Sequence, residues 1–203
     1  MELRIARIIS IIFHPLLIPT YLIAALISMN AFFALVIPED AKWKIVLLVF
    51  ITSAIIPLMV LFGMYRFGLV SSLNMDKREE RLYPYIATSI FFFLTYYLVW
   101  QAKLSPVFYY CLLGASLLAV ITLLINFRWK VSAHTVSMGG VLGAFFGLQS
   151  VLLIDMLLQI TISILIGGLV GYARLRAGTH SQAQVYAGYF LGFVVMYLLI
   201  LYY

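Results

Sequence analysis

RLRAGTHSQAQ, the sequence of residues 174–184, is a polar and basic interruption between two apolar runs near 156–173 and 185–203. A membrane-spanning helix needs about 20 apolar residues, so the two runs predict two transmembrane helices joined by this loop. The loop carries His180, one of three histidines in the chain. Ionisable side chains beside hydrocarbon are costly to keep, so they indicate a functional site.

The composition places the whole chain in the membrane. Of its 203 residues, 65% are hydrophobic and 10% are charged, whereas soluble domains average about 25% charged residues. We therefore expect one all-α domain over residues 1–203, a polytopic transmembrane helix bundle in a bacterial-type inner membrane. The net charge of +6 is concentrated in a few loops without a recognition module for nucleic acid. Membrane lipids are the expected partners, nucleic acid is not, and a homo-oligomer is left open.

Several segments are apolar enough to be considered as spans. They lie near 8–36, 44–68, 85–101, 106–126, 136–153, 156–173 and 185–203. Pro15 and Pro19 should kink the first segment and Pro57 should bend the second, because proline lacks a backbone N–H and clashes with the preceding turn. Two segments are short and two are separated only by Ile154 and Asp155. The expected number of spans is therefore seven, with six as the alternative.

The connections between these segments fall on two opposite faces. The N-terminus and the loops 69–84, 127–135 and 174–184 share one face, which together with Arg66 holds ten of the 13 Lys and Arg residues. An excess of cations usually marks the cytoplasmic side. Cations that bind phosphate would bias this count, so the face on which the site lies is left open.

Glycines recur at intervals of four in the last three segments. They are Gly139, Gly143 and Gly147, then Gly167 and Gly171, then Gly188 and Gly192. Such a stripe makes a flat helix face that lets two backbones approach closely. We expect tight helix packing around the polar loops.

Two loops carry candidate phosphate-binding groups. Lys77 and Arg81 are four residues apart, so on a helix they share one face and could grip one anion. Ser132, Ala133 and His134 precede a glycine-striped helix, whose N-terminus would offer a hydroxyl, a backbone N–H and an imidazole to an anion. Each loop, taken alone, is also typical of a solvated or structural segment.

The loop 174–184 carries the third set of candidates. Arg174 supplies charge, Gly178 would allow close approach of the backbone, and Gln184 lies one helical turn after His180, within reach of its ring. The remaining histidine, His14, is expected to be structural or to lie at the rim of the site.

Together these spacings resemble the type 2 phosphatidic acid phosphatase superfamily, which includes the vanadium haloperoxidases. Its three motifs are Lys, six residues, Arg-Pro; Pro-Ser-Gly-His; and Ser-Arg, five residues, His, three residues, Asp. This chain has Lys77, three residues, Arg81, two residues, Pro84; then Val131-Ser132-Ala133-His134; then Ala173-Arg174, five residues, His180, three residues, Gln184.

The resemblance implies an integral-membrane lipid phosphatase. It would hydrolyse a phosphate or diphosphate monoester of polyprenyl diphosphate or phosphatidate type through a phosphohistidine on His180. His134 would protonate the leaving oxygen, and Gln184 would orient His180. The expected phosphate-binding residues are Lys77, Arg81, Ser132, Ala133 and Arg174. No metal and no cofactor is expected, and the sequence shows no cluster at metal-ligand spacing.

Gln184 stands where the superfamily has aspartate. Glutamine can accept a hydrogen bond from the imidazole, but it stabilises an imidazolium only weakly. The alternative function is therefore a non-catalytic lipid-phosphate binding or carrier protein that uses the same basic pocket. A third interpretation is a helical membrane protein whose polar loops serve topology or a partner.

Overall fold

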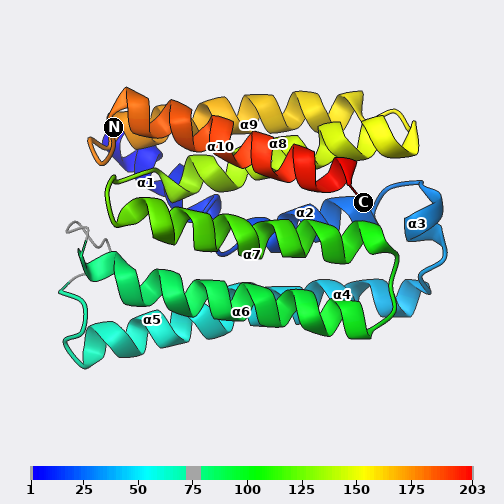
Figure 1. Ribbon diagram of the computed structural model, residues 1–203, viewed down its shortest axis with the longest axis horizontal. Coiled ribbons are helices and arrows are strands. Elements are labelled where there is room, and N and C mark those ends of the chain that lie inside the picture. Colours follow the sequence, from blue (N-terminus) through cyan, green and yellow to red (C-terminus); the bar gives the residue numbers. More distant parts are fainter. Residues whose placement is uncertain (1, 72–78, 203) are drawn as a thin grey trace.

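A computed structural model describes residues 2–71 and 79–202 as helices and their connections (Figure 1). The described part contains no strand, which confirms the all-α class. In chain order the elements are α1 (Glu2–Ile12), α2 (Ile18–Ile27), α3 (Phe32–Leu35), α4 (Glu39–Phe50), the π-helical turn η1 (Ile51–Ile55), α5 (Ile56–Arg66), the 3-10 turn η2 (Glu79–Arg81), α6 (Leu82–Gln101), α7 (Pro106–Asn126), α8 (Ala133–Leu152), α9 (Leu157–Arg176) and α10 (Gln182–Leu201).

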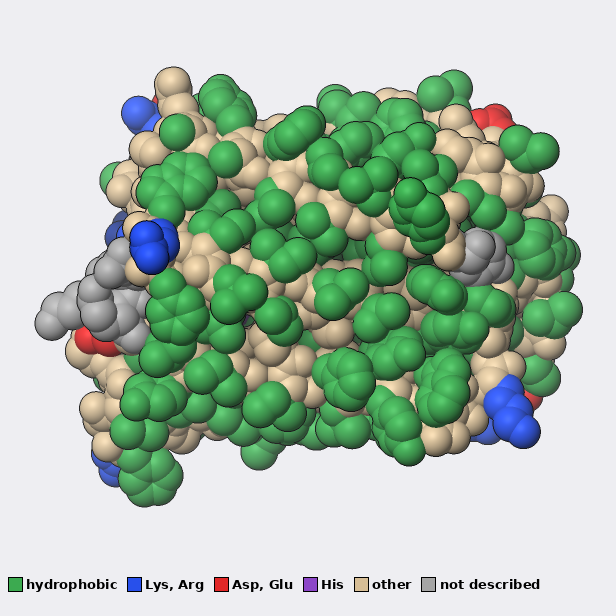
Figure 2. Space-filling model, viewed as in Figure 1, with side chains coloured by type: hydrophobic (Ala, Val, Ile, Leu, Met, Phe, Trp, Pro, Cys, Tyr) green, Lys and Arg blue, Asp and Glu red, His purple; other side chains and the backbone are tan. Residues whose placement is uncertain are grey.

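Six helical stretches of the described chain are long and apolar enough to cross a membrane. The first runs through α4, η1 and α5, and the others are α6 to α10. Figure 2 shows hydrophobic side chains over the visible flank, with charged side chains gathered at the two ends. The chain is thus a polytopic integral membrane protein, with six candidate spans among the described residues.

The segment 8–36 is not one spanning helix, contrary to the sequence prediction. Helix α1 ends at Ile12, because Pro15 has no N–H to donate and disfavours helical backbone at the preceding His14. Helix α2 then begins with Pro19 in its first turn, where the missing N–H costs nothing. The break lets α1 pack against α9.

Pro57 disturbs the helical register rather than ending the helix. The five residues of η1, just before it, form a π-helical turn, a common response to a missing or displaced helical hydrogen bond. This turn presents Thr52 to α6, where the Thr95 hydroxyl donates to the Thr52 hydroxyl at 2.9 Å. It also presents Ser53, whose hydroxyl donates to the Leu16 carbonyl at 3.3 Å.

The glycine stripes bring α8 and α10 into backbone contact. A Cβ added at Gly139 would overlap with the Tyr189 carbonyl oxygen, and one at Gly192 would overlap with the Val136 carbonyl oxygen. On α9, a Cβ at Gly167 would overlap with the Tyr189 ring. The predicted tight packing of the last helices is confirmed.

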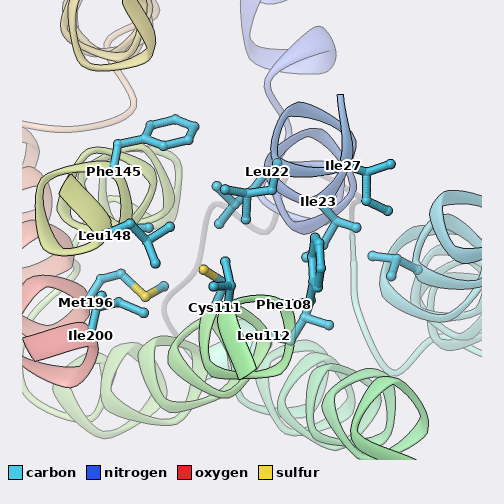
Figure 3. Packing of buried hydrophobic residues seen from close by; sticks show 14 of the residues in the cluster. Leu22, Ile23, Ile27, Phe108, Cys111, Leu112, Phe145, Leu148, Met196 and Ile200 are labelled. Carbon is cyan, nitrogen blue, oxygen red and sulfur yellow. The ribbon is translucent and has the colours of Figure 1, made fainter. Parts of the chain in front are cut away.

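A shared apolar core supports this pair of helices (Figure 3). Phe108, Cys111 and Leu112 of α7 point toward Leu22 and Ile23 of α2. Leu148 of α8 and Met196 and Ile200 of α10 close the same cluster from the other side. Helix α8 is the most buried of the six spans, so its N-terminal turn is held firmly in place.

The polar loops gather at one end of the bundle, as the sequence predicted. In Figure 1 the N-terminus, the α7–α8 connection and the α9–α10 connection lie at the left end. The α6–α7 and α8–α9 connections lie at the right end. At that right end Asp155 acts as a turn residue, accepting the Leu157 N–H at 2.9 Å.

Candidate functional site

A cavity of about 520 Å³ lies at the loop-rich end of the bundle, bordered by α1, α5, α6, α8 and α9. Its wall carries six cationic or imidazole side chains: Arg7, His14, Arg81, His134, Arg174 and His180. No described residue that lines the cavity is Asp or Glu. A cleft with one sign of charge and low-dielectric walls concentrates ions of the opposite sign. The cavity therefore suits an anion.

The loop that carries His180 is shaped by a helix end and a helix start. Helix α9 ends at Arg176, and Gly178 follows in the left-handed region at φ +66° with no atom near its missing side chain. The sequence assigned Gly178 to close backbone approach; its role here is instead the turn, because glycine adopts positive φ without strain. Ser181 then caps α10, accepting the Gln184 N–H in a capping box.

The capping box also determines which nitrogen of His180 carries a proton. The Gln184 side-chain oxygen lies 3.1 Å from the Ser181 backbone N and 3.2 Å from His180 Nδ1. A backbone N–H only donates, so the shared amide atom is the oxygen, and Nδ1 must be the protonated ring nitrogen. Nε2 of the neutral ring then keeps its lone pair. The contact expected from the sequence is present, and the role of His180 stays a prediction.

Burial keeps His14 and His180 neutral near pH 7. Burial first, and then the charges of Arg174 and Arg81, lower the pKa of His180 from 6.5 to about 3, while the Gln184 hydrogen bond acts in the opposite direction. Burial, and then Arg174, lowers the pKa of His14 to about 4. At neutral pH the His180 lone pair is therefore available.

These shifts make stability depend on pH. Below pH 6.5 the unfolded chain takes up protons at His14 and His180, while the folded protein resists them until about pH 4 and about pH 3. Stability should fall as the pH drops from 7 to 4.5, by up to ~1.4 kcal/mol per pH unit for each histidine. The measurement is the thermal unfolding midpoint in detergent. His180→Asn, which keeps a donor for Gln184, should reduce the dependence of the unfolding midpoint on pH. An unchanged dependence on pH would contradict the lowered pKa of His180.

Arg174 and Arg81 reach the cavity from different elements. Arg174 stands in the last turn of α9, and its Nη1 donates to the Ser10 hydroxyl at 3.1 Å. Its Nε is buried without a hydrogen-bond partner among the described residues. Arg81, 8% exposed, ends η2. A buried donor left open on a cavity wall calls for an explanation, and an anionic ligand would supply the missing acceptor.

His134 lies in the first turn of α8, on the same cavity wall. Its Nε2 is 3.0 Å from the Ser10 carbonyl oxygen, which only accepts, so Nε2 carries the proton. The His14 ring meets the His134 ring edge to face, with centroids 5.5 Å apart. Of the two roles open for His14 from the sequence, its place on the cavity wall favours the one at the site.

Not all predicted residues meet in the cavity. Ala133 lines it, but Ser132 does not. Ser132 immediately precedes α8 and is fully buried, and its N–H donates to the Gln184 carbonyl at 3.4 Å. The Ser132 hydroxyl has no partner within the described chain. Gln184 acts behind His180 through the ring contact. Lys77 lies outside the described residues, so its shared face with Arg81 stays a prediction.

Two residues of the cavity wall were missed from the sequence. Tyr85 lines it from α6, one helical turn after Arg81, a spacing that was available as a signal. Ser10 contacts both Arg174 and His134, residues separated from it by 164 and 124 positions. No local pattern marks such a contact. Within the described ranges, no group of three His, Cys, Asp or Glu side chains is arranged to hold a metal ion.

No family model, curated protein or solved structure matches this chain. Its function therefore has to be argued from the geometry of the site.

Proposed function

We propose that this protein is an integral-membrane phosphatase that hydrolyses a phosphate or diphosphate monoester of a lipid. The observation that carries the proposal is the His180 ring, with Nδ1 held by Gln184 and Nε2 left unprotonated, on a cationic cavity. An unprotonated imidazole nitrogen is a nucleophile, and fixed cations stabilise the charge of a transferring phosphoryl group. The motif residues support membership of the type 2 phosphatidic acid phosphatase superfamily.

In the proposed reaction, the His180 Nε2 lone pair forms a bond to phosphorus as the bond to the leaving oxygen breaks. Arg174 and Arg81 balance the charge on the non-bridging oxygens. His134 takes up a proton on Nδ1 when the anionic substrate binds, and it gives that proton to the leaving oxygen. Water then attacks the phosphohistidine and gives a proton to His134, and the phosphorus–nitrogen bond breaks to release inorganic phosphate.

Apolar surfaces beside the cavity support a lipid rather than a soluble phosphate ester. Pro57, Leu61 and Met64 of α5 form part of the cavity wall. A smaller apolar crevice of about 70 Å³ shares Pro15 and Tyr85 with the cavity and extends between α2, α6, α7 and α8. A phosphate in the cavity would leave the first carbons of its lipid chain against these surfaces.

Phosphate release from defined lipids tests the proposal. Purified protein in detergent should release inorganic phosphate from polyprenyl diphosphate or from phosphatidate, with no loss of rate in EDTA. Orthovanadate, which resembles the pentacoordinate phosphoryl transition state, should block the release. Folded protein that releases no phosphate from either lipid would contradict the proposal.

The second candidate is a lipid-phosphate binding or carrier protein with the same cavity. The observation that favours it is the neutral Gln184 amide at His180, where a carboxylate would stabilise the imidazolium more strongly. This candidate predicts that the same lipids bind and compete with inorganic phosphate while no phosphate is released.

A further inference from the structure

We infer that Ser10 of α1 is a positioning residue for this site, holding Arg174 through its hydroxyl and His134 through its carbonyl. The inference rests on the proposed function. Ser10 is buried at 9% exposure and lines the cavity. Its two polar groups each contact one of the side chains to which the proposed reaction gives a role.

The Ser10 hydroxyl is oriented by its own helix. It donates its proton to the Ala6 carbonyl at 2.9 Å, which turns its lone pairs away from that bond. Arg174 Nη1 donates to the same oxygen at 3.1 Å. One side of the guanidinium is thereby held by protein, while its buried Nε has no partner among the described residues. A guanidinium fixed in this way loses less freedom when it binds an anion.

The Ser10 carbonyl is available because α1 is broken at Pro15. In a continuous helix the His14 N–H would donate to it; here that N–H donates to the Ile11 carbonyl at 3.3 Å. The freed carbonyl accepts instead from His134 Nε2 at 3.0 Å. This contact fixes the ring and its tautomer, leaving Nδ1 as the nitrogen that exchanges a proton. The Ser10 backbone oxygen thus fixes the ring and tautomer of His134, as the Gln184 side-chain oxygen fixes those of His180.

Helix α1 is anchored at both ends of its contact with α9. Ala6 and Ile9 pack with Val170 and Ala173 in one buried cluster. At the helix start Glu2 pairs with Arg176, whose Nε donates to Glu2 Oε2 at 2.7 Å. These contacts set the position of Ser10 against Arg174.

The test compares two buried serines. Ser10→Ala removes the hydroxyl that accepts from Arg174, together with a bond to the carbonyl four residues earlier. Ser163→Ala, at 4% exposure on α9, removes only the equivalent bond to the Gln159 carbonyl. We expect Ser10→Ala to lose roughly ten- to hundredfold in kcat/KM and in orthovanadate affinity, the scale of a small misplacement at a reacting centre. Ser163→Ala should match the wild type, and Ser10→Thr should stay within a few-fold of it.

The outcomes separate this inference from the proposed function. If the wild type binds orthovanadate but releases no phosphate, the phosphatase proposal falls. In that case, orthovanadate binding that is weaker in Ser10→Ala but not in Ser163→Ala still supports the role of Ser10. Equal affinity and turnover in Ser10→Ala and Ser163→Ala would overturn it. If Ser10→Ala fails to fold, 15N NMR of wild-type His134 decides: a proton on Nε2 supports the contact, and a proton on Nδ1 in the neutral ring overturns it.

Discussion

His180→Ala should abolish phosphate release, with a loss in kcat on the order of a millionfold, the scale seen when a nucleophile or its base is removed. The substitution removes the Nε2 lone pair, which the proposed reaction uses to form the bond to phosphorus. The measurement is the initial rate of phosphate release from whichever lipid the wild type hydrolyses. A radiolabelled phosphohistidine that accumulates in the wild type on acid-free quenching should be absent from the variant.

Two matched variants separate chemistry from folding. His180→Asn keeps a side-chain donor for Gln184 but offers no nucleophile, so it should be as inactive as His180→Ala while retaining the fold. Gln182→Ala changes an exposed residue two positions away, at the start of α10, and should keep wild-type activity. Turnover that persists unchanged in His180→Ala would end the phosphohistidine mechanism.

The second large effect is expected at the contact of α8 with α10. Gly192→Ala places a methyl group on the Val136 carbonyl oxygen and close to the Gly140 backbone N, which lies 2.8 Å from the added Cβ. Backbone atoms of a packed helix cannot rotate away as a flexible side chain can, so the helices must separate. We expect a loss of ~1–3 kcal/mol or more in the free energy of unfolding. Reversible denaturation in detergent measures it.

Gly168→Ala is the control for this substitution. Gly168 lies on α9, and a Cβ added there meets no atom within 4 Å. Its unfolding free energy should therefore stay within about 0.5 kcal/mol of the wild type. Equal stabilities for the two variants would show that the backbones of α8 and α10 are not in the close contact described here. Because α8 carries His134 and α10 follows His180, Gly192→Ala should also weaken orthovanadate binding.

The sequence alone determined the features that depend on neighbours along the chain. Long apolar runs dictate spanning helices in a membrane, since every backbone polar group must be bonded within its own segment. The contact of His180 with Gln184 was predictable because residues four apart at a helix start face each other. The glycine stripes of the last three segments likewise predicted close helix packing, because only a missing side chain permits it.

What the sequence could not decide is how distant segments dock. Pro15 predicted a kink. Whether residues 8–36 continue as one tilted helix or separate into α1, α2 and α3 also depends on what each of these helices packs against. The break after Ile12 lets α1 pack on α9, and this packing brought Ser10 to Arg174 and His134 across more than a hundred residues. The same docking placed His14 beside His134, whereas the packing of α8 against α10 buried Ser132 away from the cavity.

The sequence therefore determined the membrane bundle and the local geometry of residues 174–184, because helical periodicity and hydrophobicity act over a few turns. Only the tertiary structure decided which side chains share the cavity. Those contacts depend on the relative position of whole helices, which is set by the summed packing of their faces and not by any short run of residues.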